Sequence, residues 1–214
     1  MTDTLMIKPE DVKQLREQTG AGIMDCKRAL TESGGDVDKA ILWLREKGLS
    51  TAAKKAGREA REGIVQSYIH HGARLGVLLE INCETDFVAR TDDFQQLARE
   101  IAMQIAGMAP QYVSREDVPA DIVEEQKRLF AVDAERDGRP ADRVPMIVEG
   151  KLNKWLESVC LLEQPYRDTD KKVADLITEK VALLGENIRV ARFVRMAVGE
   201  TAAGSADTGA DEAA

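Results

Sequence analysis

Aromatic residues are scarce in this chain of 214 residues, and positive charge is not in excess. Phe, Trp and Tyr make up 4% of the residues, so there are few of the rings that typically stack on single-stranded bases. The formal net charge is −8, and half of it belongs to four acidic residues in the last fifteen positions. Because nucleic-acid binders usually carry a basic excess, the composition argues against a nucleic-acid partner and favours a protein partner.

Cysteine pairs and long apolar runs are also missing. Cys26, Cys83 and Cys160 lie far apart and form no CxxC pair, which is typical of reduced thiols in a cytosolic protein. The N-terminal residues lack the apolar core of a signal peptide, and no later run approaches transmembrane length. We therefore expect a cytoplasmic protein without membrane contact, whose 43% of hydrophobic residues can bury a core.

Motifs of nucleotide loops and catalytic sites are absent as well. Neither GxxxxGK[ST] nor GxGxxG occurs, and the carboxylates are scattered over predicted helix surfaces, where solvation explains them. The adjacent His70 and His71 point to opposite faces if they lie in a strand. One of them could pair with Cys83 as a metal ligand, but no third or fourth ligand is evident, so a structural or interface histidine is favoured. We expect no catalytic residue, metal site or cofactor.

Residues 1–50 predict three short helices separated by glycines. The third begins after Asp36, whose side chain suits an N-cap, and is expected to end at Gly48. Its apolar residues recur at i, i+3, i+4 and i+7, which marks one buried stripe. The stripe comprises Val37, Ala40, Ile41 and Leu44. This pattern predicts a helical module of the ubiquitin-associated type, followed by a charged, partly helical linker over residues 51–62.

The hydrophobic period changes to that of strands after residue 62. Residues 63–70 and 74–83 predict a hairpin, and clean alternation in the second run indicates one buried face. A last strand is predicted through residues 188–198. Four helical patterns lie between these strands: residues 94–105, 120–137, 148–159 and 173–184.

These elements predict an α+β fold, in which a three-stranded antiparallel sheet packs against helices on one face. We assign residues 63–199 to this core domain. Residues 200–214 are an acidic tail of low complexity and are expected to be disordered.

One segment stands apart from the regular patterns. Directly after the best predicted strand comes Glu84-Thr85-Asp86-Phe87-Val88, and a new helix begins near Thr91. A strand that turns at once into a helix can present a rigid aromatic side chain at its tip. From the pattern alone, a core position that caps the sheet is the favoured interpretation of Phe87. An anchor that enters a partner's pocket is the alternative.

Two long stretches resemble signatures of the elongation factor Ts family. Residues 12–30, VKQLREQTGAGIMDCKRAL, resemble the opening signature, and residues 80–90, EINCETDFVAR, are similar to the second. Three shorter stretches also resemble family motifs in the family's order: residues 148–152, 160–165 and 184–188. The resemblance covers about residues 5–199. Thr91 replaces the Asn expected after the second signature, and we expect this to alter only a helix cap.

The resemblance implies a guanine-nucleotide exchange factor that promotes GDP release from elongation factor Tu, without covalent chemistry of its own. The partner-binding residues that it implies are Thr85, Asp86, Phe87 and Val88. In the family, this segment wedges against helices of the Tu nucleotide domain. The resemblance implies that Phe87 inserts between helices and that Asp86 helps to displace the network around the Mg²⁺ of the nucleotide, so that GDP is held less tightly.

A second set of contacts is implied for the helical module. Arg16, Ile23 and Met24 would grip another helix of Tu, with Lys54 or Lys55 nearby. For Met24 a core position is an equal alternative, because methionine suits both roles. For Ile23 a core position is at least as well supported.

Length adds an expectation about assembly. Longer relatives carry two related core halves and a helical hairpin insertion, whereas this chain has room for one sheet unit. A three-stranded sheet with an exposed edge invites pairing with a second copy, so we expect a homodimer.

The main rival to an exchange factor is an adaptor or nascent-chain chaperone of the ubiquitin-associated type, which leaves residues 85–88 and the sheet without a purpose. A small-molecule enzyme and an RNA binder have less support.

Overall fold

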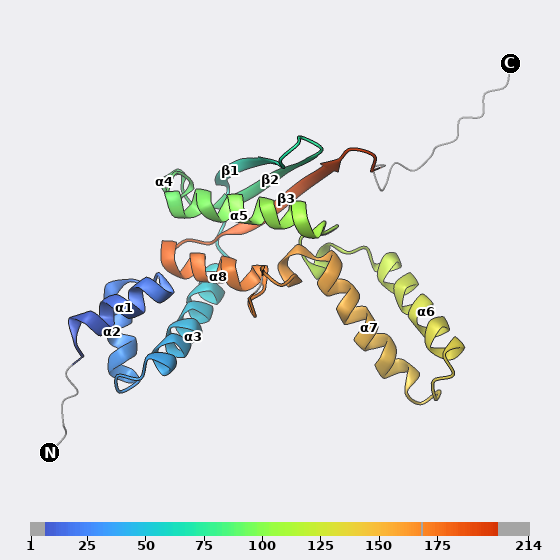
Figure 1. Ribbon diagram of the computed structural model, residues 1–214, viewed down its shortest axis with the longest axis horizontal. Helices are drawn as coiled ribbons and strands as arrows, with labels where there is room; N and C mark the ends of the chain where they lie inside the picture. Colours follow the sequence, from blue (N-terminus) through green and yellow to red (C-terminus); the bar gives the residue numbers. More distant parts are fainter. Residues whose placement is uncertain (1–6, 168, 201–214) are drawn as a thin grey trace.

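The computed structural model describes residues 7–167 and 169–200, and Figure 1 shows how they are arranged. The sheet and helix α5 form the middle of the molecule. The N-terminal helices extend toward one end of its long axis, and the paired helices α6 and α7 project at the other. Apart from Glu200, the predicted tail lies outside the described residues. No described helix combines the length and the apolar character that crossing a bilayer requires.

The N-terminal part contains the three predicted helices: α1 (Pro9–Thr19), α2 (Ile23–Glu32) and α3 (Val37–Lys55). Asp36 is the N-cap of α3, and its side chain accepts a hydrogen bond from the Lys39 amide at 3.1 Å. The three helices share a small core of their own, made of Val12, Leu15, Cys26, Ala29, Leu30 and Ala40. The structure thus confirms three helices, while the likeness to ubiquitin-associated modules stays a prediction.

Helix α3 runs through Gly48 to Lys55, so the prediction that Gly48 ends the helix is wrong. The physical reason is tertiary packing, because α3 lies against α8 and Gly48 is buried where they meet. A Cβ atom at Gly48 would lie 3.5 Å from that of Ala182. The first part of the predicted linker is therefore helical and docked on α8.

The core domain has the predicted sheet, formed by β1 (Glu62–Ile69), β2 (Leu75–Cys83) and β3 (Arg189–Ala197). The strands are antiparallel in the order β1-β2-β3, with β2 in the middle. Helix α5 (Asp92–Met108) packs against β1 and β2, and α8 (Val173–Leu184) packs against α5. One continuous core joins the sheet face to both helices, which confirms the α+β prediction.

Helices α6 (Ala120–Arg136) and α7 (Val144–Val159) pair with each other and project from the rest of the molecule (Figure 1). A small cluster at their base contains Val118, Leu156, Val159 and Cys160. Three single turns complete the fold: α4 (Asp86–Ala89), the 3-10 turn Arg115–Asp117 and the 3-10 turn Leu161–Glu163. The helix periods were predicted, but the projection of this hairpin was not.

A substitution at Gly63 tests how closely β1 approaches β2. Its φ is +145°, and a Cβ atom there would lie 2.1 Å from the Ile81 carbonyl oxygen. We expect Gly63→Ala to lower the free energy of unfolding by about 2–4 kcal/mol, because backbone must move. The matched control is Gly150→Ala in α7, where nothing lies within 4 Å. There we expect a gain of about 0.5–1 kcal/mol from helix propensity. Urea denaturation measures both, and equal midpoints would contradict the packing argument.

Candidate functional site

Phe87 projects from the single helical turn that follows β2. Thr85 has extended backbone and caps this turn, its hydroxyl accepting a hydrogen bond from the Val88 amide at 3.4 Å. Ala89 is buried and Val88 packs against the core, so the outer side of α4 is left to Phe87. Phe87 is 78% exposed, the highest value among the large hydrophobic residues of the described chain. The core interpretation of Phe87 is therefore wrong.

Asp86 lies beside Phe87 in the first turn of α4. Its carboxylate forms an ion pair with Arg90 at 2.8 Å, in which the Arg90 side chain is 76% exposed and the Asp86 side chain 47%. Exposed ion pairs of this kind are worth little, typically ~0–1 kcal/mol. Asp86 can therefore exchange Arg90 for a partner's group at low cost in free energy.

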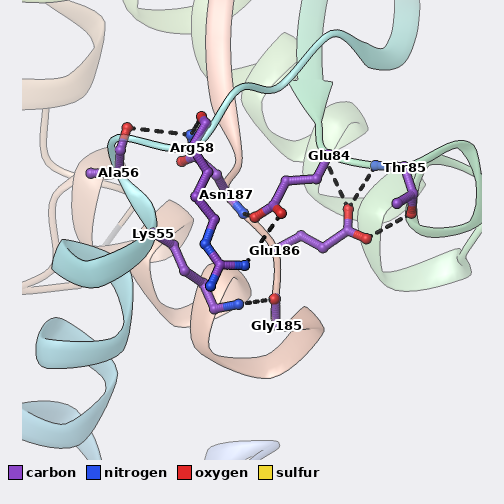
Figure 2. A network of polar contacts seen from close by, with 8 residues as sticks. All are labelled: Lys55, Ala56, Arg58, Glu84, Thr85, Gly185, Glu186 and Asn187. Atoms are coloured by element: carbon purple, nitrogen blue, oxygen red, sulfur yellow. Dashed lines mark hydrogen bonds and ion pairs between the residues drawn. The ribbon is translucent and has the colours of Figure 1, made fainter.

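The backbone before α4 is held by the loop between α8 and β3, as Figure 2 shows. One carboxylate oxygen of Glu186 accepts hydrogen bonds from the amides of Glu84 at 3.1 Å and Thr85 at 3.0 Å. The other oxygen accepts from the Thr85 hydroxyl at 2.6 Å. Three hydrogen bonds to one carboxylate thus fix the segment from which Phe87 projects.

A second set of contacts joins this loop to the chain after α3 (Figure 2). The Asn187 side chain donates to the carbonyl oxygens of Arg58 at 2.8 Å and Ala56 at 3.4 Å. Lys55 donates to the Gly185 carbonyl oxygen. Glu84 completes the network. Its carboxylate accepts a hydrogen bond from the backbone amide of Asn187 at 2.7 Å and forms an ion pair with Arg58 at 3.4 Å. The amide hydrogen bond, followed by Arg58, lowers the pKa of Glu84.

The residues implied for the helical module lie around the connection between α1 and α2. Arg16 is exposed in the last turn of α1. Ile23 and Met24 begin α2 and are 58% and 69% exposed, so the core alternatives for both are wrong. Lys54 is exposed, whereas Lys55 already binds the Gly185 carbonyl oxygen. In Figure 1, this module and α4 lie toward the same end of the molecule.

The suggested pairing of a histidine with Cys83 is wrong. Cys83 pairs with Glu62 at one end of the hairpin, while the histidines follow Ile69 at the other end. The His70 ring instead forms a hydrogen bond with the Tyr68 hydroxyl at 2.9 Å. Burial, together with the nearby charge of Glu186, raises the pKa of the Cys83 thiol to about 11. Within the described residues, no group of three His, Cys, Asp or Glu side chains is arranged to hold a metal ion.

Glu84, Glu186 and Asn187 were not predicted as site residues. Residues 184–188 were noted only for their resemblance to a family motif. A local signal did exist, since Gly185 ends α8 in the left-handed conformation and two polar residues follow it in the loop before β3. The sequence could not indicate that these side chains meet a segment about one hundred positions earlier.

Comparisons with known proteins agree on one family. The family model described as Elongation factor TS matches residues 36–200. A protein named elongation factor Ts from Carboxydothermus hydrogenoformans is 58% identical over 196 residues, which cover 91% of this chain and 90% of the relative. Another from Coprothermobacter proteolyticus is 60% identical over 190 residues, covering 88% and 96%. A third from Moorella thermoacetica is 56% identical over 196 residues, covering 91% and 97%.

These matches and the α+β fold define a translation elongation factor, a protein of the biosynthetic machinery. The chain belongs to the elongation factor Ts family. The resemblance inferred from the two signatures is thereby confirmed, and the second signature contains the exposed Phe87.

The lowered pKa of Glu84 makes a prediction for acid stability. Because the folded pKa lies below the unfolded value of about 4.3, ionised Glu84 stabilises the fold at higher pH. This contribution is lost as the pH falls through the folded value. We expect the free energy of unfolding to fall less for Glu84→Gln than for the unaltered chain between about pH 6 and about pH 3. Urea titrations at each pH measure this, and parallel curves would refute it.

Proposed function

We propose that this chain is a guanine-nucleotide exchange factor that speeds GDP release from elongation factor Tu and performs no covalent chemistry. The observation that carries the proposal is the exposure of Phe87 on a short, braced turn. A large aromatic side chain held outside the core has the character of a binding anchor, because it buries much apolar area at little entropic cost when a partner covers it. We place this activity in the cytoplasm.

Phe87 inserts between helices of the Tu nucleotide domain, and α4 acts as the base of the wedge. Asp86 enters with it and disturbs the polar network that holds the Mg²⁺ of the bound nucleotide. That cation neutralises phosphate charge, so a weaker hold on it loosens GDP. Thr85 and Val88 hold α4 in place: Thr85 caps the turn, and Val88 packs against the core.

The helical module provides a second grip. Ile23 and Met24 expose apolar side chains on α2, and Arg16 adds a positive charge on α1. Lys54 is the more suitable of the two lysines for a partner contact, since Lys55 is engaged within the chain. Two separated grips on one partner hold the wedge in place while the nucleotide leaves.

Thermodynamic linkage limits what the factor does. If this chain weakens the binding of GDP to Tu by a given ratio, GDP weakens the binding of this chain to Tu by the same ratio. The chain therefore speeds exchange in both directions, and the concentrations of GDP and GTP set the outcome.

We expect Phe87→Ala to abolish most of the acceleration of GDP release. Loss of a buried aromatic anchor costs ~2–4 kcal/mol of complex stability, or roughly thirty- to a thousandfold in affinity. Stopped-flow release of a fluorescent GDP from purified Tu measures it. Met146→Ala, which removes an exposed apolar side chain from α7, is the matched control and should act like the unaltered chain.

Three outcomes separate the hypotheses. Equal acceleration by the unaltered chain and the Phe87 variant moves the mechanism away from α4. No acceleration by either contradicts the exchange function. If the chain binds unfolded polypeptides but not Tu, the rival hypothesis of an adaptor or nascent-chain chaperone is favoured.

We also propose a homodimer, in which the open faces of two sheets pack together. Five apolar residues on this face are each more than half exposed: Val65, Ile69, Leu78, Val194 and Met196. The strand register places them in adjacent rows opposite the core face. The face also carries Ser67 and the Glu80–Arg192 ion pair. A sheet face with several exposed apolar side chains is rarely left in water, and face-to-face packing of two sheets is a standard way to bury it. This face supports self-association better than the exposed edge does.

The dimer makes its own prediction. Leu78→Glu places a charge at the centre of the face, where burial without a partner is costly, so we expect monomers. Val132→Glu on α6 alters an equally exposed residue outside the face and is the matched control. Analytical ultracentrifugation at micromolar concentration distinguishes the two. Monomers for the unaltered chain would refute the proposal.

A further inference from the structure

We propose that Glu186 is a positioning residue for nucleotide exchange, whose carboxylate orients Phe87 by fixing the backbone that precedes α4. The inference deepens the proposed function and rests on it. Glu186 lies in the loop between α8 and β3, about one hundred residues from the segment that it holds. Figure 2 shows its side chain reaching from that loop to Glu84 and Thr85.

The hydrogen bonds have a fixed direction. A carboxylate can only accept, so the Thr85 hydroxyl must donate its proton to Glu186. The hydroxyl lone pairs are then left to accept from the Val88 amide, which is the cap of α4. Glu186 is thus connected through one hydroxyl to the turn that carries Phe87. The two backbone amides bound to the other oxygen set the direction in which the chain leaves β2.

The role is positional because other contacts fix the fold around it. Strand β2 is paired with β1 and β3 up to Asn82, and the core cluster contains Cys83 and Ala89 on either side of the segment. Glu186 itself lies outside that cluster and is partly exposed. Its removal therefore leaves the sheet and core intact but frees residues 84 and 85 to take other directions.

The same loop also holds the other predicted contact surface. Asn187 and Gly185 bind the chain at and after the end of α3, the last helix of the helical module. Residues 185–187 therefore fix α4 on one side and the module on the other. A partner that is gripped at both places requires this fixed separation, which explains why a polar loop is braced so heavily.

Amide hydrogen exchange of the free chain, followed by NMR, tests the contact without any partner. In Glu186→Ala the Glu84 and Thr85 amides lose their acceptor, and we expect their exchange to accelerate about ten- to a hundredfold. Amides in the middle of β2 should not change. Glu186→Gln keeps one oxygen for the two backbone amides, and its amide group can donate to the Thr85 hydroxyl. This variant should therefore retain slow exchange.

GDP release from Tu then tests the role in exchange. We expect Glu186→Ala to lose about tenfold or more in the efficiency of nucleotide release, and Glu186→Gln to restore most of it. If Glu186 acts through Phe87, the double variant Glu186→Ala, Phe87→Ala should be no slower than Phe87→Ala alone. A merely structural role predicts additive losses in the double variant.

The failures are distinguishable. If Glu186→Ala accelerates GDP release as fully as the unaltered chain does, the positioning role is overturned and the proposed function stands. Unchanged exchange of the Glu84 and Thr85 amides overturns the positioning role as well. No acceleration by the unaltered chain overturns the proposed function, and the role of Glu186 in it.

Discussion

The backbone amides that follow β2 have no strand to pair with, and their need for acceptors organises the site. A partly buried N–H group without an acceptor costs about 1–3 kcal/mol. The carboxylate of Glu186 accepts hydrogen bonds from two such amides. In the opposite direction, the carboxylate of Glu84 accepts one from the backbone amide of Asn187. This reciprocal exchange joins two segments about one hundred residues apart. It ends the strand cleanly and makes room for a single turn in which Phe87 points outward.

The remaining surface features depend on that arrangement. Among the exposed apolar side chains of the described residues, three groups stand out: Phe87 on α4, Ile23 and Met24 at the start of α2, and the residues on the open sheet face. Scattered exposed apolar residues are ordinary, but a rigid aromatic side chain and a sheet face with five exposed apolar residues call for partners. In the proposed function the first two surfaces bind one partner, and in the proposed dimer the third packs against a second copy of the chain. The weak ion pair of Asp86 leaves that carboxylate free to change partners.

Periodicity in the sequence predicted the parts of the fold that depend on local patterns. The alternation in residues 74–83 and the helical spacing in residues 173–184 correspond to β2 and α8, because each buries one regular face. Gly48 was misjudged, since its low helix propensity is outweighed by close packing against α8. Tertiary contacts of this kind leave no periodic signal.

The site was only partly predictable. The sequence located the segment around Phe87, but the pattern alone favoured a core position, because most phenylalanines are buried. Exposure was decided by Val88 and Ala89 turning inward instead. Glu186 could not be assigned a role at all, because its contacts depend on how the α8–β3 loop meets the end of β2.

Linkage provides the most direct test of the central claim that this chain and GDP oppose each other on elongation factor Tu. Isothermal titration would compare the affinity of the chain for nucleotide-free Tu with its affinity for Tu bound to GDP. The affinity of Tu for GDP would be measured with and without saturating chain. The account predicts tighter binding to the nucleotide-free form, by the same ratio as the loss of GDP affinity. Equal affinity for both forms of Tu would contradict it.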